Sequence, residues 1–201
     1  MTNHEAIRAA VRLLSPVLGD AQQSWTEAEI LLAHAWKKDR AWVLAYPDLV
    51  LKPAGQKKYR GMIRRRLGHE PMAYLVGETN FYGRPFKTDK RALIPRPETE
   101  ELVEHVINEM KHASLNVDHL SSDVPCSVFR VPCSRRVLLW DVGTGSGAVA
   151  TTIKAECPDA EVIASDKHRA ALSLARANAK RLRVKGIRFY QADLLDQRIR
   201  S

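Results

Sequence analysis

Cysteine is scarce in this sequence, with three residues in 201, namely Cys126, Cys133 and Cys157. Cysteines at these spacings fit neither a framework of paired disulfides nor the close Cys/His clusters that hold zinc. The sequence therefore predicts free thiols in a reducing compartment and no metal site.

Long hydrophobic runs are also missing. No run approaches the ~20 apolar residues that span a bilayer, and the first ten residues lack the basic start and apolar core of a secretory signal. We therefore expect no membrane segment and a cytoplasmic monomer. The mitochondrial matrix is the alternative for a eukaryotic source, although Glu5 within a predicted helix argues against a cleaved transit peptide.

Acidic residues are fewer than basic ones. The sequence has 32 lysines and arginines and 23 aspartates and glutamates, which gives a formal net charge of +9. Such a charge favours acidic partners such as ribosomes, RNA or an acidic protein surface. The basic run from Lys57 to Arg66 is interpreted as a solvated helix face, with contact to such a partner as the alternative.

The first part of the chain is predicted to be a helical domain over residues 1–75, because apolar residues recur there at helical spacing. Ser24, followed three residues later by Glu27, has the form of a capping box and is expected to open the second helix. Residues 76–95 are expected to form a hairpin linker around the turn residues Gly83 and Pro85.

The second part, residues 96–201, is predicted to be α/β. Pro97 and the glutamates after it are expected to start a helix that runs to about Lys111. Residues 113–135 show no sustained period and are interpreted as a surface insertion. Strand, helix, strand, helix and strand then alternate over 137–142, 148–156, 161–165, 168–181 and 187–191. This order predicts a parallel sheet with right-handed crossovers.

A glycine-rich loop follows the first of these strands and contains Gly143, Thr144, Gly145, Ser146 and Gly147. Glycines let the backbone approach a ligand closely, and the N–H groups at the start of the next helix favour a negative group. The loop lacks the Gly-Lys-Ser/Thr ending of a P-loop. Its third glycine comes one position too early for the dinucleotide fingerprint, so NAD is disfavoured. The loop predicts a nucleotide-type cofactor site.

Acidic residues mark the ends of the three predicted strands, at Asp141, Asp166 and Asp193. Asp166 is placed to accept hydrogen bonds from ribose hydroxyls, and Asp193 from an adenine amino group. Capping of the following helix is the alternative interpretation of both residues. Three carboxylates at one edge of a sheet suit a cationic sulfonium better than a pyrophosphate.

Several motifs, together with this loop, make the chain resemble the peptide chain release factor glutamine methyltransferases of the HemK/PrmC type. They are Arg64-Arg-Arg-Leu-Gly-His-Glu-Pro-Met-Ala-Tyr-Leu-Val-Gly77, Phe81-Tyr-Gly83, Leu93-Ile-Pro-Arg-Pro-Glu-Thr-Glu-Glu-Leu-Val103 and Asp141-Val-Gly-Thr-Gly-Ser-Gly-Ala148. The resemblance implies a Rossmann-like class I methyltransferase domain, preceded by a helical domain that binds a release factor and by a hairpin linker. The implied cofactor is S-adenosyl-L-methionine.

The same resemblance implies roles for individual residues. The loop from Gly143 to Gly147 would hold the methionine part of the cofactor, Asp166 would hold the ribose, and Asp193 with Leu194 would flank the adenine. The implied reaction transfers a methyl group to the side-chain amide nitrogen of the glutamine in a release factor's Gly-Gly-Gln motif.

On the substrate side, the resemblance implies that Pro95, Arg96 and Pro97 line the path of the glutamine, although they can equally serve only to start a helix. The family carries an Asn-Pro-Pro-Tyr motif after its fourth strand, whereas this sequence ends at Ser201, before any such motif. We therefore expect the catalytic residues to lie outside this sequence, the methyltransferase domain to be incomplete and the chain to be inactive alone. Two alternatives stay open: an adenine-N6 methyltransferase acting on nucleic acid, which fits the net charge, and a non-catalytic binding module.

Overall fold

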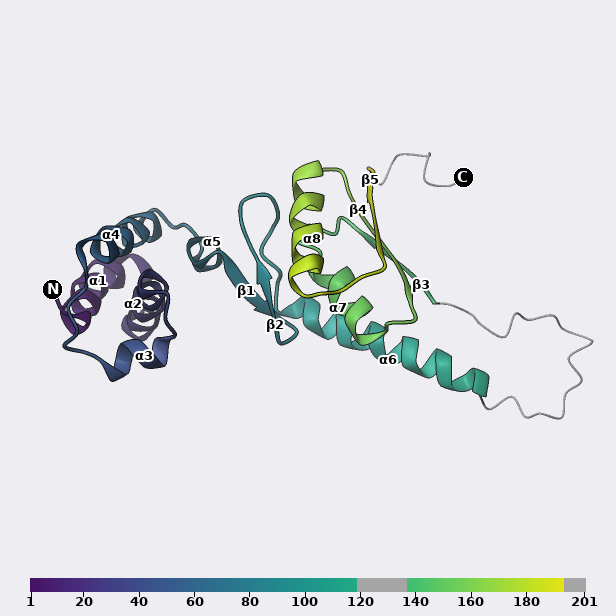
Figure 1. Ribbon diagram of the computed structural model, residues 1–201, viewed down its shortest axis with the longest axis horizontal. Coiled ribbons are helices and arrows are strands. Elements are labelled where there is room, and N and C mark those ends of the chain that lie inside the picture. The colour runs from purple at the N-terminus through teal and green to yellow at the C-terminus, as the bar shows by residue number, and fades with distance from the viewer. Residues whose placement is uncertain (119–136, 194–201) are drawn as a thin grey trace, which may run out of the picture. The chain divides into compact units, whose positions relative to one another are not determined.

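The chain divides into two compact units, Met1–Gly77 and Glu78–Ser201 (Figure 1). The structure is a computed structural model that describes residues 1–118 and 137–193. For residues 111–118 it describes the backbone only. Within these residues, no helix combines the length and the apolar character that crossing a membrane requires.

The first unit consists of helices packed around one apolar core. Its helices are α1 (Asn3–Leu18), α2 (Ala21–Trp36), α3 (Arg40–Ala45), α4 (Pro53–Leu67) and α5 (Met72–Val76). The core centres on Leu14, Leu31 and Leu32, which are fully buried. The helical periodicity of this region therefore reflects apolar stripes that face one another.

Helix α2 begins four residues earlier than the predicted capping box implies. Its N-cap is Asp20, whose Oδ1 accepts the backbone N–H groups of Gln22 at 2.8 Å and Gln23 at 3.2 Å. Ser24 lies inside the first turn, where its hydroxyl donates to the carbonyl oxygen of Asp20. The prediction that Ser24 and Glu27 open this helix is wrong, because an aspartate upstream caps it equally well.

The second unit begins with a hairpin of two antiparallel strands, β1 (Glu78–Phe81) and β2 (Arg84–Lys87). Tyr82 and Gly83 form the turn, with φ of 49° and 69°, as two-residue hairpin turns of this twist require. Phe81 and Phe86 are buried and meet edge to face, with ring centroids 6.0 Å apart. The hairpin is therefore part of the core of the second unit rather than only a linker.

Helix α6 (Glu98–Asp118) follows Pro97 and continues beyond Lys111, where the sequence analysis expected it to end. Residues 112–118 contain neither glycine nor proline, so the helix meets no residue that would stop it. The expectation of irregular structure from residue 113 is therefore wrong for 113–118. The rest of the expected insertion, 119–135, lies outside the described residues.

Strands and helices then alternate as predicted. The elements are β3 (Leu138–Val142), α7 (Ala148–Glu156), β4 (Glu161–Asp166), α8 (Arg169–Arg181) and β5 (Ile187–Gln191). The three strands are parallel in the order β3-β4-β5. The α/β fold class predicted from the alternation is confirmed, and the carboxyl ends of the three strands lie at one edge of the sheet.

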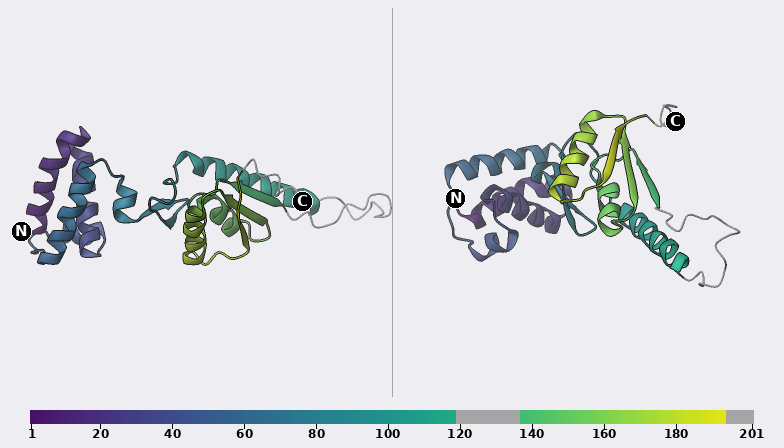
Figure 2. Two further views of the ribbon diagram at one scale, coloured as in Figure 1. Left: turned by 90° about the horizontal axis from the view of Figure 1, so that it is seen from above. Right: turned by 45° about the vertical axis from the view of Figure 1, so that its right-hand side comes forward.

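The two faces of this sheet differ. Helix α7 packs on β3 and β4, and α8 packs on β4 and β5 (Figure 2). Val162 and Ala164 of β4 are completely buried. Leu138, Trp140 and Val142 alternate along β3 and are 58%, 44% and 39% exposed. The loops that connect strands to α7 and α8 leave the sheet at its carboxyl edge, where ligands of open α/β sheets bind.

Candidate functional site

The glycine-rich loop between β3 and α7 is anchored to the neighbouring strand. The carbonyl oxygen of Ser165, the residue before the end of β4, accepts the N–H groups of Gly143 at 2.8 Å and Thr144 at 2.9 Å. Thr144 and Ser146 are buried, so their side chains lie within the protein. The loop therefore presents its backbone, rather than these side chains, at the carboxyl edge of the sheet.

The three glycines of the loop have different surroundings. A methyl group added to Gly143, which has φ of 75°, would meet no atom within 4 Å among the described residues. At Gly145 it would lie 3.7 Å from Cβ of Ala92. At Gly147, which has φ of 78°, it would lie 2.8 Å from Cβ of Ala175 in α8. Gly143 thus borders open space that a ligand can fill, whereas Gly147 lets α8 approach the loop.

Asp141, the fourth residue of β3, braces the loop and caps α7. Its Oδ2 accepts the hydroxyl of Thr144 at 2.6 Å and the backbone N–H of Ala150 at 3.1 Å. Burial raises the pKa of this carboxyl, while the two hydrogen bonds oppose the shift and the nearby Asp166 adds to it. Because a carboxylate already caps this helix, its N-terminus is a poor site for the phosphates of a dinucleotide.

The raised pKa of Asp141 predicts a pH dependence of stability. The carboxyl binds its proton more tightly in the folded chain than in the unfolded chain, where its pKa has the ordinary value of 3.8. Its contribution to the free energy of unfolding is therefore largest below pH 3.8 and falls as the pH rises through the raised pKa. Urea unfolding from pH 4 to 7 should show the stability of the chain decreasing relative to that of Asp141→Asn. An increase over this range would contradict the assignment.

Asp166, the last residue of β4, faces the glycine loop. Its Oδ2 accepts the N–H of Gly145 at 3.0 Å, and its Oδ1 accepts the N–H of His168 at 2.8 Å. The residue is 8% exposed. A carboxylate offers about four acceptor positions, so these two bonds leave room for hydroxyl donors of a ligand. Asp166 therefore starts the turn into α8 and also lies against the loop.

Of the other two predicted cofactor residues, the structure describes Asp193, which comes two residues after the end of β5. The N–H of Ala192 donates to the carbonyl oxygen of Asp166 at 3.1 Å, which brings the chain after β5 alongside the end of β4. Asp193 follows and is exposed. Leu194 lies outside the described residues.

The predicted substrate-side residues precede α6. Arg96 and Pro97 are exposed, and Pro95 is partly buried. The carbonyl oxygens of Arg96 and Pro97 accept the N–H groups of Thr99 at 3.0 Å and Glu100 at 2.8 Å. These residues therefore start the helix, and the chain just before them reaches the glycine loop at Ala92.

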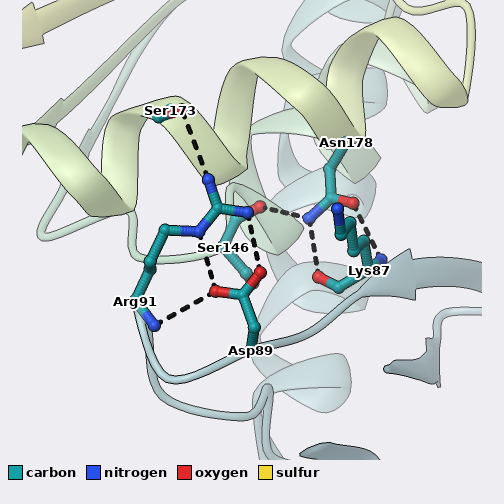
Figure 3. A network of polar contacts seen from close by, with 6 residues as sticks. All are labelled: Lys87, Asp89, Arg91, Ser146, Ser173 and Asn178. Carbon is teal, nitrogen blue, oxygen red and sulfur yellow. Dashed lines mark hydrogen bonds and ion pairs between the residues drawn. The ribbon is translucent and has the colours of Figure 1, made fainter. Parts of the chain in front are cut away.

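Sequence reasoning missed Ala92 and Asn178. Asn178 lies on α8 and is fully buried, and its side chain bonds to the backbone of Ser146 in the glycine loop and of Lys87 at the end of β2 (Figure 3). One signal was available, because Asn178 continues the apolar stripe of Leu172, Leu174 and Ala175 at helical spacing. Ala92 gives no such signal.

Comparison with known proteins assigns both parts of the chain. Residues 5–77 match the family model described as PrmC N-terminal domain, and residues 114–200 match the model described as Methyltransferase small domain. The helical part of the chain is therefore similar to the N-terminal domain of PrmC proteins, and its α/β part is similar to small-domain methyltransferases. The first match coincides with the helical unit, and the second contains the glycine loop with Asp141, Asp166 and Asp193. The α/β unit thus has a class I methyltransferase fold.

Curated relatives agree with this assignment. The chain is 36% identical over 167 residues to a release factor glutamine methyltransferase of Coxiella burnetii, covering 83% of this chain and 53% of that relative. It is 38% identical over 170 residues to one of Bordetella pertussis, covering 85% and 55%. It is 34% identical over 167 residues to one of Escherichia coli, covering 83% and 52%. The chain spans about half the length of these relatives.

Proposed function

We propose that this chain forms the cofactor-binding part of an S-adenosylmethionine-dependent methyltransferase that modifies the glutamine side chain of release factors. The family of its α/β unit supports use of this cofactor in general. The names of the relatives support a release factor as the substrate. In this proposal the first unit contacts the release factor, and the net charge of +9 favours work close to the ribosome.

The placement of Asp166 supports the cofactor most directly. Its carboxylate lies at the end of β4 and accepts the N–H of Gly145, so a ligand bound at the loop would lie beside it. With Asp141 it gives the loop two carboxylates, which would repel a pyrophosphate and attract a sulfonium and an ammonium group. These residues fit the chemistry of S-adenosylmethionine better than that of NAD.

The loop residues then have distinct proposed roles. Gly143 leaves open the space in which the methionine part of the cofactor would lie, and Asp166 accepts the ribose hydroxyls. Asp193 and Leu194 remain the proposed neighbours of the adenine, and Pro95, Arg96 and Pro97 the proposed lining of the glutamine path. When bound, S-adenosylmethionine supplies an electrophilic methyl group. The amide nitrogen that would accept it is a weak nucleophile, so the protein must orient it.

Cofactor binding is tested by calorimetric titration with S-adenosylmethionine. We expect the chain to bind and Asp166→Asn to bind about 10–100-fold more weakly, because a charged acceptor of hydroxyl groups contributes about 1.5–3 kcal/mol. Asp159→Asn is the matched control, since Asp159 is exposed and precedes the opposite end of β4. A folded chain that releases no heat, or equal losses in both variants, would contradict the proposed site.

The acceptor is tested with radiolabelled S-adenosylmethionine, by offering a release factor and a DNA duplex side by side. Label on the release factor that disappears when its Gly-Gly-Gln glutamine is replaced by alanine supports the proposal. Label on the duplex would favour the adenine-N6 alternative instead. Cofactor binding with label on neither acceptor would show that this chain binds the cofactor without transferring its methyl group, which agrees both with the expected inactivity of the chain alone and with a binding module.

A further inference from the structure

Asn178 joins three separate segments of the second unit through one side-chain amide. Its Oδ1 accepts the backbone N–H of Lys87 at 2.8 Å, and its Nδ2 donates to the carbonyl oxygen of Lys87 at 3.0 Å and to that of Ser146 at 2.9 Å. The side chain lies between the end of β2 and the glycine loop (Figure 3). One buried residue of α8 therefore holds both segments at a fixed separation.

The chemistry of this position requires an asparagine. One acceptor and two donors face one N–H group and two carbonyl oxygens, so both amide donors and the amide oxygen are used. Aspartate has the same shape but cannot donate to the two carbonyls, and alanine or leucine would leave the buried hydrogen bond to Ser146 and the two part-buried bonds to Lys87 unmade. The amide thus fixes the backbone at Lys87 relative to the backbone at Ser146, which apolar packing alone would not do.

The strip of residues 87–92 runs from this amide to the glycine loop. The guanidinium of Arg91 forms two bonds with the carboxylate of Asp89, at 2.8 and 2.7 Å, and its Nη1 lies 3.3 Å from the hydroxyl of Ser173 on α8 (Figure 3). Helix α8 therefore holds the strip at two points. At its end, Cβ of Ala92 lies 3.7 Å from the position of a methyl group added to Gly145.

We propose that Asn178 is a positioning residue that fixes the strip 87–92 against the glycine loop, so that the two together form adjacent walls of the cofactor site. The proposal rests on the proposed function for the identity of the ligand. Asn178 itself is buried behind these walls and acts through Lys87 and Ser146. The strip leads directly to Pro95, Arg96 and Pro97, so the same amide also sets where the proposed glutamine path meets the loop.

The test compares Asn178→Ala with Val103→Ala in the 201-residue chain. Val103 is fully buried on α6 in the apolar core of the same unit and belongs to neither the loop nor the strip, so its truncation lowers stability and leaves the hydrogen bonds of Asn178 in place. Circular dichroism and urea unfolding must first show both variants folded at the assay temperature. We expect calorimetry to show S-adenosylmethionine binding at least tenfold weaker in Asn178→Ala and within twofold of the parent in Val103→Ala. Equal affinities in the two variants would overturn the proposal.

Hydrogen–deuterium exchange gives a second readout that needs no bound cofactor. In Asn178→Ala, amides of both 87–92 and 143–147 should exchange at least tenfold faster than in the parent. In Val103→Ala, the exchange rates of these two segments relative to the other amides of the second unit should stay unchanged. Faster exchange in one segment alone would overturn the coupling. If the parent chain binds no cofactor, the proposed function fails, while this exchange result still decides the positioning role.

If Asn178→Ala does not fold, the parent chain alone remains informative. Adding S-adenosylmethionine should slow exchange in 87–92 together with 143–147, because the two segments would border one site. Protection confined to 143–147 would overturn the proposal.

Discussion

Replacing Gly147 by alanine is expected to lower the free energy of unfolding of the second unit by about 2–5 kcal/mol. The added methyl group would lie 2.8 Å from Cβ and 3.0 Å from Cα of Ala175, so the start of α7 and the middle of α8 would have to move apart. The positive φ of 78° adds conformational strain for any residue with a side chain. Urea unfolding followed by circular dichroism measures the effect.

Gly143→Ala is the matched control. It has a similar φ of 75°, but its methyl group would meet no atom within 4 Å in the described part of the chain. Its expected cost is therefore the conformational strain alone, about 1–2 kcal/mol. Under the proposed function this variant should fold and lose affinity for S-adenosylmethionine, because the methyl group occupies the space beside the loop. Equal destabilisation by the two substitutions would refute the distinct roles of these glycines.

The glycine loop shows what local sequence can and cannot predict. Its place between a strand and a helix follows from apolar periodicity and from the glycines, and the structure has the alternation as predicted. The different surroundings of the three glycines depend on Ala175 and Ala92. These two residues lie beside the loop only because α8 and the strip after β2 pack against it. Contacts between distant segments are set by tertiary structure, so spacing within the motif does not reveal them.

The acidic residues illustrate the same limit. Their positions at strand ends were predictable from the pattern, but their hydrogen bonds were not. One carboxylate oxygen of Asp141 accepts hydrogen bonds from both Thr144 and Ala150. The two oxygens of Asp166 accept the N–H groups of Gly145 and His168. The two interpretations of Asp166 left open by the sequence, a ligand contact and a helix start, are compatible because a carboxylate accepts several bonds.

The misplaced start of α2 has a physical origin that the sequence pattern hid. Ser24 and Glu27 have the spacing of a capping box, but Asp20 lies upstream in an extended conformation and caps the helix itself. This frees Glu27 for a long-range partner. Its carboxylate accepts hydrogen bonds from Nε of Arg66 at 2.6 Å and from Nη2 at 3.1 Å. Glu27, which was predicted to cap α2, therefore joins α2 to α4.

Loss of this ion pair is the second large effect that we expect. The side chains of Arg66 and Glu27 are 13% and 9% exposed, so Arg66→Ala would leave a carboxylate largely out of water and without its cation. Breaking such a pair costs about 3 kcal/mol or more, and urea unfolding of the first unit should show it. Arg65→Ala is the matched control, because Arg65 is the next residue along α4 and makes the same two-bond contact with Glu70 while 49% exposed.

The exposed pair of Arg65 should contribute at most about 1 kcal/mol, because water screens the charges. A double variant, Arg66→Met with Glu27→Leu, separates the loss of the charge pair from the loss of packing. With both charges removed together, no desolvated charge remains, so stability should return to within about 1 kcal/mol of the parent. If the double variant is as unstable as Arg66→Ala, packing of the arginine stem across α2 and α4, rather than the unpaired carboxylate, accounts for the loss.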